Sequence, residues 1–178
     1  MDWVFRHSKR SAIGIDKDAT PLKWAAEHNL VGLDPERQRL EFICGDVLNV
    51  HARPVDCIAA FNFSYCVFKT RSELLRYFQQ VHHGLVKDGA FFFDLHGGPD
   101  AQRVLTEKQR IGNFTYIWEQ KNFDAVNNHT TCLIYFQTEK GKRPKQAFRY
   151  DWRLWSYPEL RDGLMDMGFR RVDLFWEG

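Results

Sequence analysis

The sequence predicts an alternating α/β fold with a doubly wound, mostly parallel sheet, followed by an antiparallel β-meander. Short apolar runs of strand length recur in the first half of the chain, as is typical of strands that are covered on both faces. Helical patterns separate several of these runs, and a strand, helix, strand order gives parallel strands with right-handed crossovers. After Gly97-Gly98-Pro99 the pattern changes to longer alternating segments joined by polar turns, which indicates antiparallel strands.

The first strand and helix are predicted near the N-terminus. Ser11–Asp16 reads SAIGID, an apolar run that is too short for a helix and β-branched enough for a buried strand. Thr20 followed by Pro21 is typical of an N-cap and a first helical residue, which predicts a helix to about Leu30. Two further apolar runs predict strands at Leu40–Cys44 and Val55–Phe63.

The next helix has the strongest local signals. Thr70 and Glu73 in TRSE have the spacing of a capping box, in which each side chain satisfies a free backbone N–H of the first turn. An apolar stripe at helical spacing follows, formed by Leu74, Leu75, Phe78, Val81 and Leu85. We expect this helix to end near Lys87, with a turn at Asp88-Gly89 and a strand at Ala90–Leu95.

The second half of the chain is predicted to begin with a helix at Asp100–Gln109. Alternating segments separated by polar turns then predict an antiparallel meander, with strands at Phe114–Phe123, Thr130–Thr138 and Gln146–Trp155. Ser156 and Glu159 have the spacing of a second capping box, before a helix that is predicted through Met167 with Gly168 as the residue after its end. Phe169–Trp176 is the last predicted strand.

Length and composition favour one globular domain at 1–178 in the cytoplasm. The 178 residues are 44% hydrophobic, which is enough for the core of a single domain. The net charge is +2 with both signs interspersed, and no apolar stretch is long enough to span a membrane. Neither a nucleic-acid partner nor a membrane partner is therefore favoured. The four cysteines show no C-x-x-C spacing, which favours reduced thiols.

The candidate site lies just past the ends of the predicted strands, because open parallel sheets bind ligands outside the carboxyl ends of their strands. Asp16 ends the first strand, where a carboxylate can accept both hydroxyls of a ribose. Asp46 follows the next strand, where a carboxylate can accept the exocyclic amine of adenine. A single acidic residue at a strand end is more often a capping or solvated residue, so the prediction of an adenosine cofactor depends on the pair.

In order and spacing, the chain resembles the class I S-adenosylmethionine-dependent methyltransferases, whose fold is Rossmann-like. The segments that carry the resemblance are SAIGIDKDATPLKWA, LEFICGDVLNV, VDCIAAFNFSYCVFKTRSELLRYFQQVHHGLVKDGAFFFDL and LWSYPELRDGLMDMGFRRVDLF. The resemblance implies that S-adenosylmethionine is the cofactor and that Asp16 holds its ribose. It also implies that Asp46 and Val47 contact adenine, and that Phe61 and Asn62 lie beside the reactive methionine end.

The resemblance also bears on the methyl acceptor. Family members that act on small molecules carry an antiparallel insertion after the fifth strand. The meander takes that place at 111–155, between a cofactor-binding core at 11–110 and a last helix and strand at 156–178. The resemblance therefore implies methyl transfer to a nitrogen or oxygen of a small molecule.

The chain departs from the family pattern at both ends. It has no glycine-rich G-x-G-x-G loop, and Met1–Lys9 takes the place of the helix that follows that loop in the family. The family's seventh strand is lacking as well. We therefore expect a domain shortened at both ends, with an incomplete sheet edge through which copies of the chain could associate as a homo-oligomer.

Candidates for catalysis come from strand ends and from charged pairs. Tyr65 and His96 lie close to strand ends, where either could orient a substrate or accept a proton, although packing explains each as simply. Asp94 and His96 share a strand face, but no third ligand accompanies them, so no metal is expected. Arg149 and Arg153 also share a face, as binders of an acidic substrate or as ordinary surface charge.

Two other functions stay open. A non-catalytic binding module would be consistent with the missing glycine-rich loop. A nicotinamide-dependent oxidoreductase would also use Asp16 at a ribose. The lack of any G-x-G-x-x-G and the antiparallel second half count against the oxidoreductase.

Overall fold

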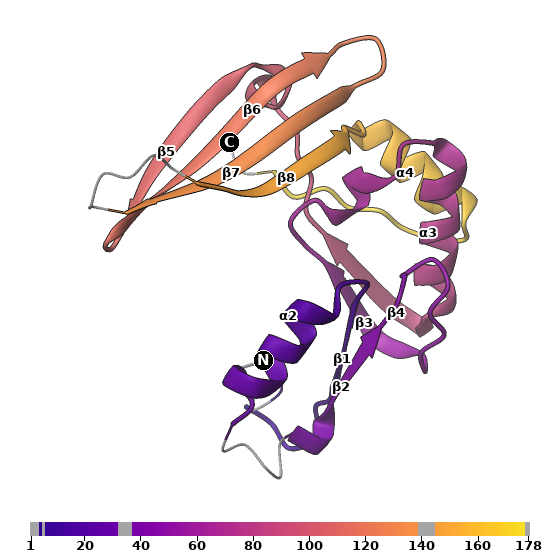
Figure 1. Cartoon of the computed structure of the whole chain (residues 1–178). Helices are drawn as coiled ribbons and strands as arrows, with labels where there is room; N and C mark the ends of the chain where they lie inside the picture. The colour runs from indigo at the N-terminus through magenta and orange to yellow at the C-terminus, as the bar shows by residue number, and fades with distance from the viewer. Residues whose placement is uncertain (1–3, 5, 32–36, 139–144, 177–178) are drawn as a thin grey trace. The chain divides into compact units, whose positions relative to one another are not determined.

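The structure, a computed structural model, describes residues 4, 6–31, 37–138 and 145–176 (Figure 1). These residues form a mixed α/β fold, as the sequence predicts. The chain divides into two compact units, 1–53 and 54–178, which are described separately here. One domain over the whole chain, and one continuous parallel sheet within it, stay predictions.

The first unit contains a parallel pair of strands, β1 at Ala12–Asp16 and β2 at Leu40–Cys44. Both strands have the predicted bounds to within a residue, and Asp16 pairs with Cys44 at their carboxyl ends. Helix α2 spans Ala19–Trp24 and continues as a π-helical turn at Ala25–Asn29. Its N-cap is Asp18 and not the predicted Thr20, because the Asp18 carboxylate accepts the Thr20 backbone N–H at 2.8 Å.

The Arg39 side chain contacts the backbone near the N-terminus at Val4, His7 and Arg10. The Arg39 guanidinium donates to the backbone oxygens of Val4, His7 and Arg10, at 2.6, 2.9 and 3.0 Å. A short 3₁₀ turn at Arg37–Arg39 carries this arginine and leads directly into β2. All three bonds come from one guanidinium nitrogen, Nη1, which links these backbone carbonyls to the residue that precedes β2.

The second unit begins with another parallel pair, β3 at Val55–Ala60 and β4 at Leu85–Phe93. Strand β3 ends three residues before the predicted Phe63, because Asn62 and Phe63 adopt left-handed φ values of 60° and 54° that cannot continue a strand. A 3₁₀ turn follows at Ser64–Val67.

Helix α3 spans Arg71–His83, and its predicted capping box between Thr70 and Glu73 is present. The helix ends before the predicted Lys87, and β4 begins already at Leu85. At the predicted Asp88-Gly89 turn, the pairing between β3 and β4 is interrupted. Val55 pairs with Leu85 and Cys57 with Ala90, so the intervening residues, which include Asp88 at a φ of 65°, are looped out.

The meander is a four-stranded antiparallel sheet in the order β5-β6-β7-β8 (Figure 1). Strands β6, β7 and β8 span Phe114–Asp124, His129–Thr138 and Lys145–Arg153, as predicted to within a few residues. The predicted helix at Asp100–Gln109 is wrong. A 3₁₀ turn occupies Pro99–Gln102, and β5 occupies Leu105–Ile111. Strand β5 pairs with β6 along its whole length, and a tight turn that contains Gly112 at a φ of 55° joins the two strands. The hydrogen bonds to β6 therefore outweigh the helical preference of the local sequence.

The last helix, α4, spans Tyr157–Asp166 with the predicted capping box between Ser156 and Glu159. Gly168 follows at a φ of 99°, as expected for the residue after a helix end. The predicted strand at Phe169–Trp176 is wrong, because the structure forms no ladder over those residues. The aromatic ring of Phe169 instead contacts His82 and Phe91.

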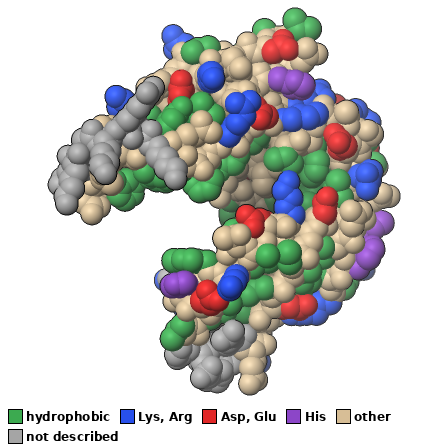
Figure 2. Space-filling model, in the orientation of Figure 1, with side chains coloured by type: hydrophobic (Ala, Val, Ile, Leu, Met, Phe, Trp, Pro, Cys, Tyr) green, Lys and Arg blue, Asp and Glu red, His purple; other side chains and the backbone are tan. Residues whose placement is uncertain are grey.

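The buried residues of the second unit lie on α3 and α4, where they pack beside β4, and also on strands β6, β7 and β8 of the meander. Phe78 on α3 is fully buried, and its ring contacts those of Phe91 and Phe93 on β4. Gly163 lets α4 approach α3 closely, because a Cβ there would lie 3.3 Å from atoms of Leu75 and Phe78. Among the described residues, none of the helices has the length and apolar character that a membrane crossing requires. On the face that Figure 2 shows, Lys and Arg side chains lie among Asp and Glu side chains.

Candidate functional site

Asp16 lies at the carboxyl end of β1, where the sequence predicts a ribose contact. Its side chain is half-buried, and its Oδ1 accepts the Asp18 backbone N–H at 2.9 Å. The Asp16 backbone oxygen accepts the Gly45 N–H at 2.9 Å, which joins the two strand ends. Within the described ranges no donor contacts the second carboxylate oxygen, so that oxygen can accept a ligand hydroxyl.

Asp46 lies just past the carboxyl end of β2. Its Oδ1 accepts the Leu48 N–H at 2.9 Å, and its backbone oxygen accepts the N–H groups of Asn49 and Val50. Val47 beside it is 38% exposed. Because β1 and β2 are parallel and Asp16 pairs with Cys44, the structure brings both carboxylates to the same edge of this strand pair.

Phe61 and Asn62 follow β3 in the second unit. Phe61 is 59% exposed, and Asn62 begins the left-handed turn. The Asp94 carboxylate, directly after β4, closes this turn: it accepts the Asn62 N–H at 2.8 Å and the Phe63 N–H at 2.9 Å. Asp94 therefore shapes the loop that carries Asn62, a role that the sequence analysis missed because its signal lies in contacts across two strands.

His96 lies two residues further along, in a mostly aromatic setting. Its ring centroid is 4.9 Å from that of Phe63 and 5.8 Å from that of Trp152. Its Nε2 lies 3.1 Å from Oε1 of Gln120 on β6. Burial lowers the pKa of His96, while the bond to Gln120 and the charge of Asp94 oppose this shift.

Tyr65, the other catalytic candidate, lies in the core. Its side chain is 1% exposed, and its ring packs edge-on against Phe93. Burial raises the pKa of Tyr65, and a contact with the His96 backbone opposes this shift only in part. A hydroxyl in this position is closed to a substrate and stays protonated, so the structure supports the packing role.

The charged residues that the sequence analysis paired all contact other groups of the described chain. Both Asp94 oxygens accept backbone N–H groups, and no group of three or more His, Cys, Asp or Glu among the described residues could hold a metal ion. Arg149 donates to both oxygens of Asp151. Arg153 bonds Glu159 at 3.1 Å and stacks 3.6 Å above the Trp155 ring centroid. These contacts favour structural roles for both arginines.

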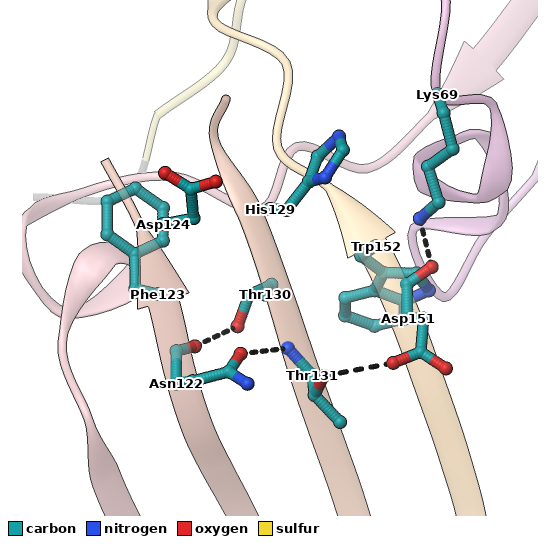
Figure 3. A pocket seen from close by; sticks show the side chains of 9 residues that line it. All are labelled: Lys69, Asn122, Phe123, Asp124, His129, Thr130, Thr131, Asp151 and Trp152. Carbon is teal, nitrogen blue, oxygen red and sulfur yellow. Dashed lines mark hydrogen bonds between the residues drawn. The ribbon is translucent and has the colours of Figure 1, made fainter. Parts of the chain in front are cut away.

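A hollow of about 410 Å³ on the meander was not predicted (Figure 3). The Thr131 hydroxyl donates to Asp151 at 2.9 Å, and the Asn122 side-chain oxygen accepts the Thr131 N–H at 2.8 Å. Lys69 reaches the Asp151 backbone oxygen from the other side. The polar groups shown at the wall are thus largely engaged with one another. The hollow is lined by Lys69, Asn122, Phe123, Asp124, His129, Thr130, Thr131, Asp151 and Trp152.

Solved structures resemble the chain, although its sequence matches no family model and no curated protein. An S-adenosylmethionine-dependent methyltransferase from Clostridium acetobutylicum superposes with a TM-score of 0.70 at 18% identity, over 89% of this chain and 63% of that one. The CcbJ methyltransferase from Streptomyces caelestis gives 0.71 at 15%, over 88% and 62%.

An amino pentose methyltransferase from Micromonospora echinaspora, solved with S-adenosylmethionine bound, gives a TM-score of 0.66 at 13% identity, over 89% of this chain and 65% of that one. The chain thus spans less than two thirds of the length of these structures. The described elements, in their order along the chain, have the Rossmann-like fold of S-adenosylmethionine-dependent methyltransferases.

Proposed function

We propose that the protein binds S-adenosylmethionine and transfers its methyl group to a nitrogen or oxygen of a small molecule. The observation that carries this proposal is the pair of carboxylates at the carboxyl edge of β1–β2. Asp16 and Asp46 each use one oxygen to accept a local backbone N–H, which fixes the side chain. Among the described residues no donor contacts the second oxygen of either carboxylate, so the acceptors match a ribose diol and an adenine amine in chemistry.

The cofactor would supply a sulfonium that releases a methyl group to an in-line nucleophile. Because the leaving group is good, orienting the reactants can supply most of the catalysis, on the order of 7–11 kcal/mol in favourable cases. The chain's own contribution is therefore to hold and orient. The Asp16 and Asp46 carboxylates would hold the adenosine half, and the Phe61-Asn62 loop, closed by Asp94, would border the reactive end.

A small-molecule acceptor is supported by the meander and by one similar structure. The β5–β8 sheet follows β4 along the chain, and by the resemblance this is the place in which family members that act on small molecules carry their insertion. The similar structure from Micromonospora echinaspora is an amino pentose methyltransferase. A small compound with amino or hydroxyl groups is the acceptor class that fits both observations.

Isothermal titration with S-adenosylmethionine tests the proposal, using Asp16→Asn as the diagnostic variant. Asparagine keeps an oxygen for the Asp18 N–H but removes the charge and the second acceptor oxygen. We expect binding to the unchanged chain and a loss of roughly 1–3 kcal/mol in the variant, which is about 5- to 150-fold in Kd. Glu41→Gln removes the same charge near the start of β2, away from its carboxyl end, and should leave Kd unchanged.

Two results would overturn the proposal. Absence of any heat with both S-adenosylmethionine and S-adenosylhomocysteine would favour a non-catalytic binding module. Binding of a nicotinamide dinucleotide in place of S-adenosylmethionine would favour an oxidoreductase. An equal Kd for Asp16→Asn and the unchanged chain would remove Asp16 from the site.

A further inference from the structure

The orientation of one buried amide determines the hydrogen positions beside His96. The side-chain nitrogen of Gln120 lies 2.8 Å from the Asp100 backbone oxygen and 2.6 Å from the Arg103 backbone oxygen. Carbonyl oxygens only accept hydrogen bonds, so the atom facing both of them must be the NH₂ group. In the alternative orientation the amide oxygen of Gln120 would face the two backbone oxygens and no hydrogen bond could form. Because Gln120 is 2% exposed, water could not replace the lost hydrogen bonds.

This orientation assigns the tautomer of His96. The other end of the amide, Oε1, faces His96 Nε2 at 3.1 Å. Since an amide oxygen cannot donate, the hydrogen of this bond must belong to Nε2. A neutral imidazole carries a single N–H, so Nδ1 of His96 bears a lone pair.

The Nδ1 lone pair is available to a ligand. No hydrogen bond to Nδ1 is formed by the described residues, and the ring is half-buried with no atom sealed and unsatisfied. Phe63, Trp118 and Trp152 face the ring and are uncharged, and Gln120 is neutral. Asp94 is the charged group that acts on the ring, and burial outweighs it, so the pKa of His96 falls and the ring is neutral near pH 7.

We propose that His96 is the proton acceptor of the site, acting through Nδ1, and that Gln120 is the positioning residue that fixes its tautomer. This inference rests on the proposed methyl transfer. The acceptor nitrogen or oxygen forms a bond to the methyl carbon, while the carbon–sulfur bond breaks and leaves its electron pair on sulfur. The proton that the acceptor loses passes to Nδ1, and the resulting imidazolium still donates from Nε2 to Gln120.

The tautomer can be measured without any methyl acceptor or cofactor. Protein labelled with ¹⁵N-histidine gives long-range ¹H–¹⁵N correlations that distinguish Nε2–H from Nδ1–H, and the signals of His96 are those lost in His96→Asn. We expect neutral His96 to be Nε2–H throughout. An Nδ1–H tautomer in the unchanged chain would overturn the proposal, whatever the protein binds. In Gln120→Leu, if its melting shows that it folds, we expect a mixture of the two tautomers.

Chemical modification tests whether Nδ1 is accessible. Diethyl pyrocarbonate reacts with unprotonated imidazole nitrogens, and the site of attack is read by mass spectrometry. We expect modification of His96 in the folded chain near pH 7, alongside the exposed His83. Modification of His83 with none at His96 would overturn the proposal, because a lone pair closed to a small reagent cannot take a proton from a substrate.

Addition of S-adenosylmethionine separates this inference from the proposed function. If titration shows binding, we expect the ¹⁵N signals of His96 to shift and those of His83 to stay. Binding that leaves the His96 signals unmoved would remove His96 from the site while the proposed function stands. Absence of binding would overturn the proposed function, and with it the catalytic role of His96, while the measured tautomer would still report on the Gln120 contact.

Discussion

Replacing Asp94 with asparagine should destabilise the second unit through the loop after β3. The Asp94 carboxylate accepts the N–H groups of Asn62 and Phe63, at 2.8 and 2.9 Å, and both of these residues have left-handed φ values. Hydrogen bonds to a charged group contribute about 1.5–3 kcal/mol each. Asparagine retains one acceptor oxygen, but its NH₂ group faces the second N–H, so we expect a loss of about 2–3 kcal/mol in unfolding free energy.

The matched control is Asp56→Asn on β3. Asp56 is exposed, and its side chain has no hydrogen-bond partner within the described residues, so its change should stay within about 0.5 kcal/mol. Urea unfolding measures the global effect, and hydrogen exchange of the amides at 55–63 measures the local one. Equal stability of the two variants, with unchanged exchange at Asn62 and Phe63, would refute the argument that Asp94 holds this loop.

Two further predictions follow from burial in the second unit. Phe78→Ala removes a fully buried ring and should lower the urea-unfolding free energy by about 3–5 kcal/mol. Phe148→Ala, at a ring 52% exposed, should cost far less, and equal losses would contradict the assignment of the core. For His96, burial puts the pKa in the folded chain below its usual 6.5, so the unfolded chain binds more protons just below that pH. Stability should therefore fall as pH decreases through that window, and less steeply in His96→Gln; identical slopes would show that His96 does not titrate differently on folding.

Elements whose signals are local could be predicted from the sequence. The two capping boxes, Thr70 with Glu73 and Ser156 with Glu159, start helices α3 and α4 as expected, because their partners lie within one turn. The apolar runs of β1 and β2 were also predicted almost to the residue. An apolar run shows strand character in its own composition, but the predicted burial of these two strands is wrong, since neither has a buried residue among those described.

Elements that depend on distant partners could not be predicted in this way. The segment Leu105–Ile111 has a sequence that allows a helix, and it becomes a strand because β6 offers a complete ladder across a tight turn. The early end of β3 has a similar cause. The predicted strand residues Asn62 and Phe63 adopt left-handed φ values instead, and their N–H groups bond to Asp94. Asp94 lies 32 residues from Asn62 along the chain.

For the candidate site, the sequence by itself determined which chemical groups follow the strands: Asp16 and Asp46 in the first unit, Asn62 and His96 in the second. Strand order was sufficient for this within each strand pair, because parallel strands bring their carboxyl ends to one edge. Only the tertiary structure decided what those groups can do. Gln120 lies 24 residues from His96, and folding places its amide between two backbone carbonyls and the ring. The direction of a hydrogen bond depends on which donors and acceptors packing brings together. Which nitrogen of the His96 ring carries the hydrogen is therefore a property of the fold.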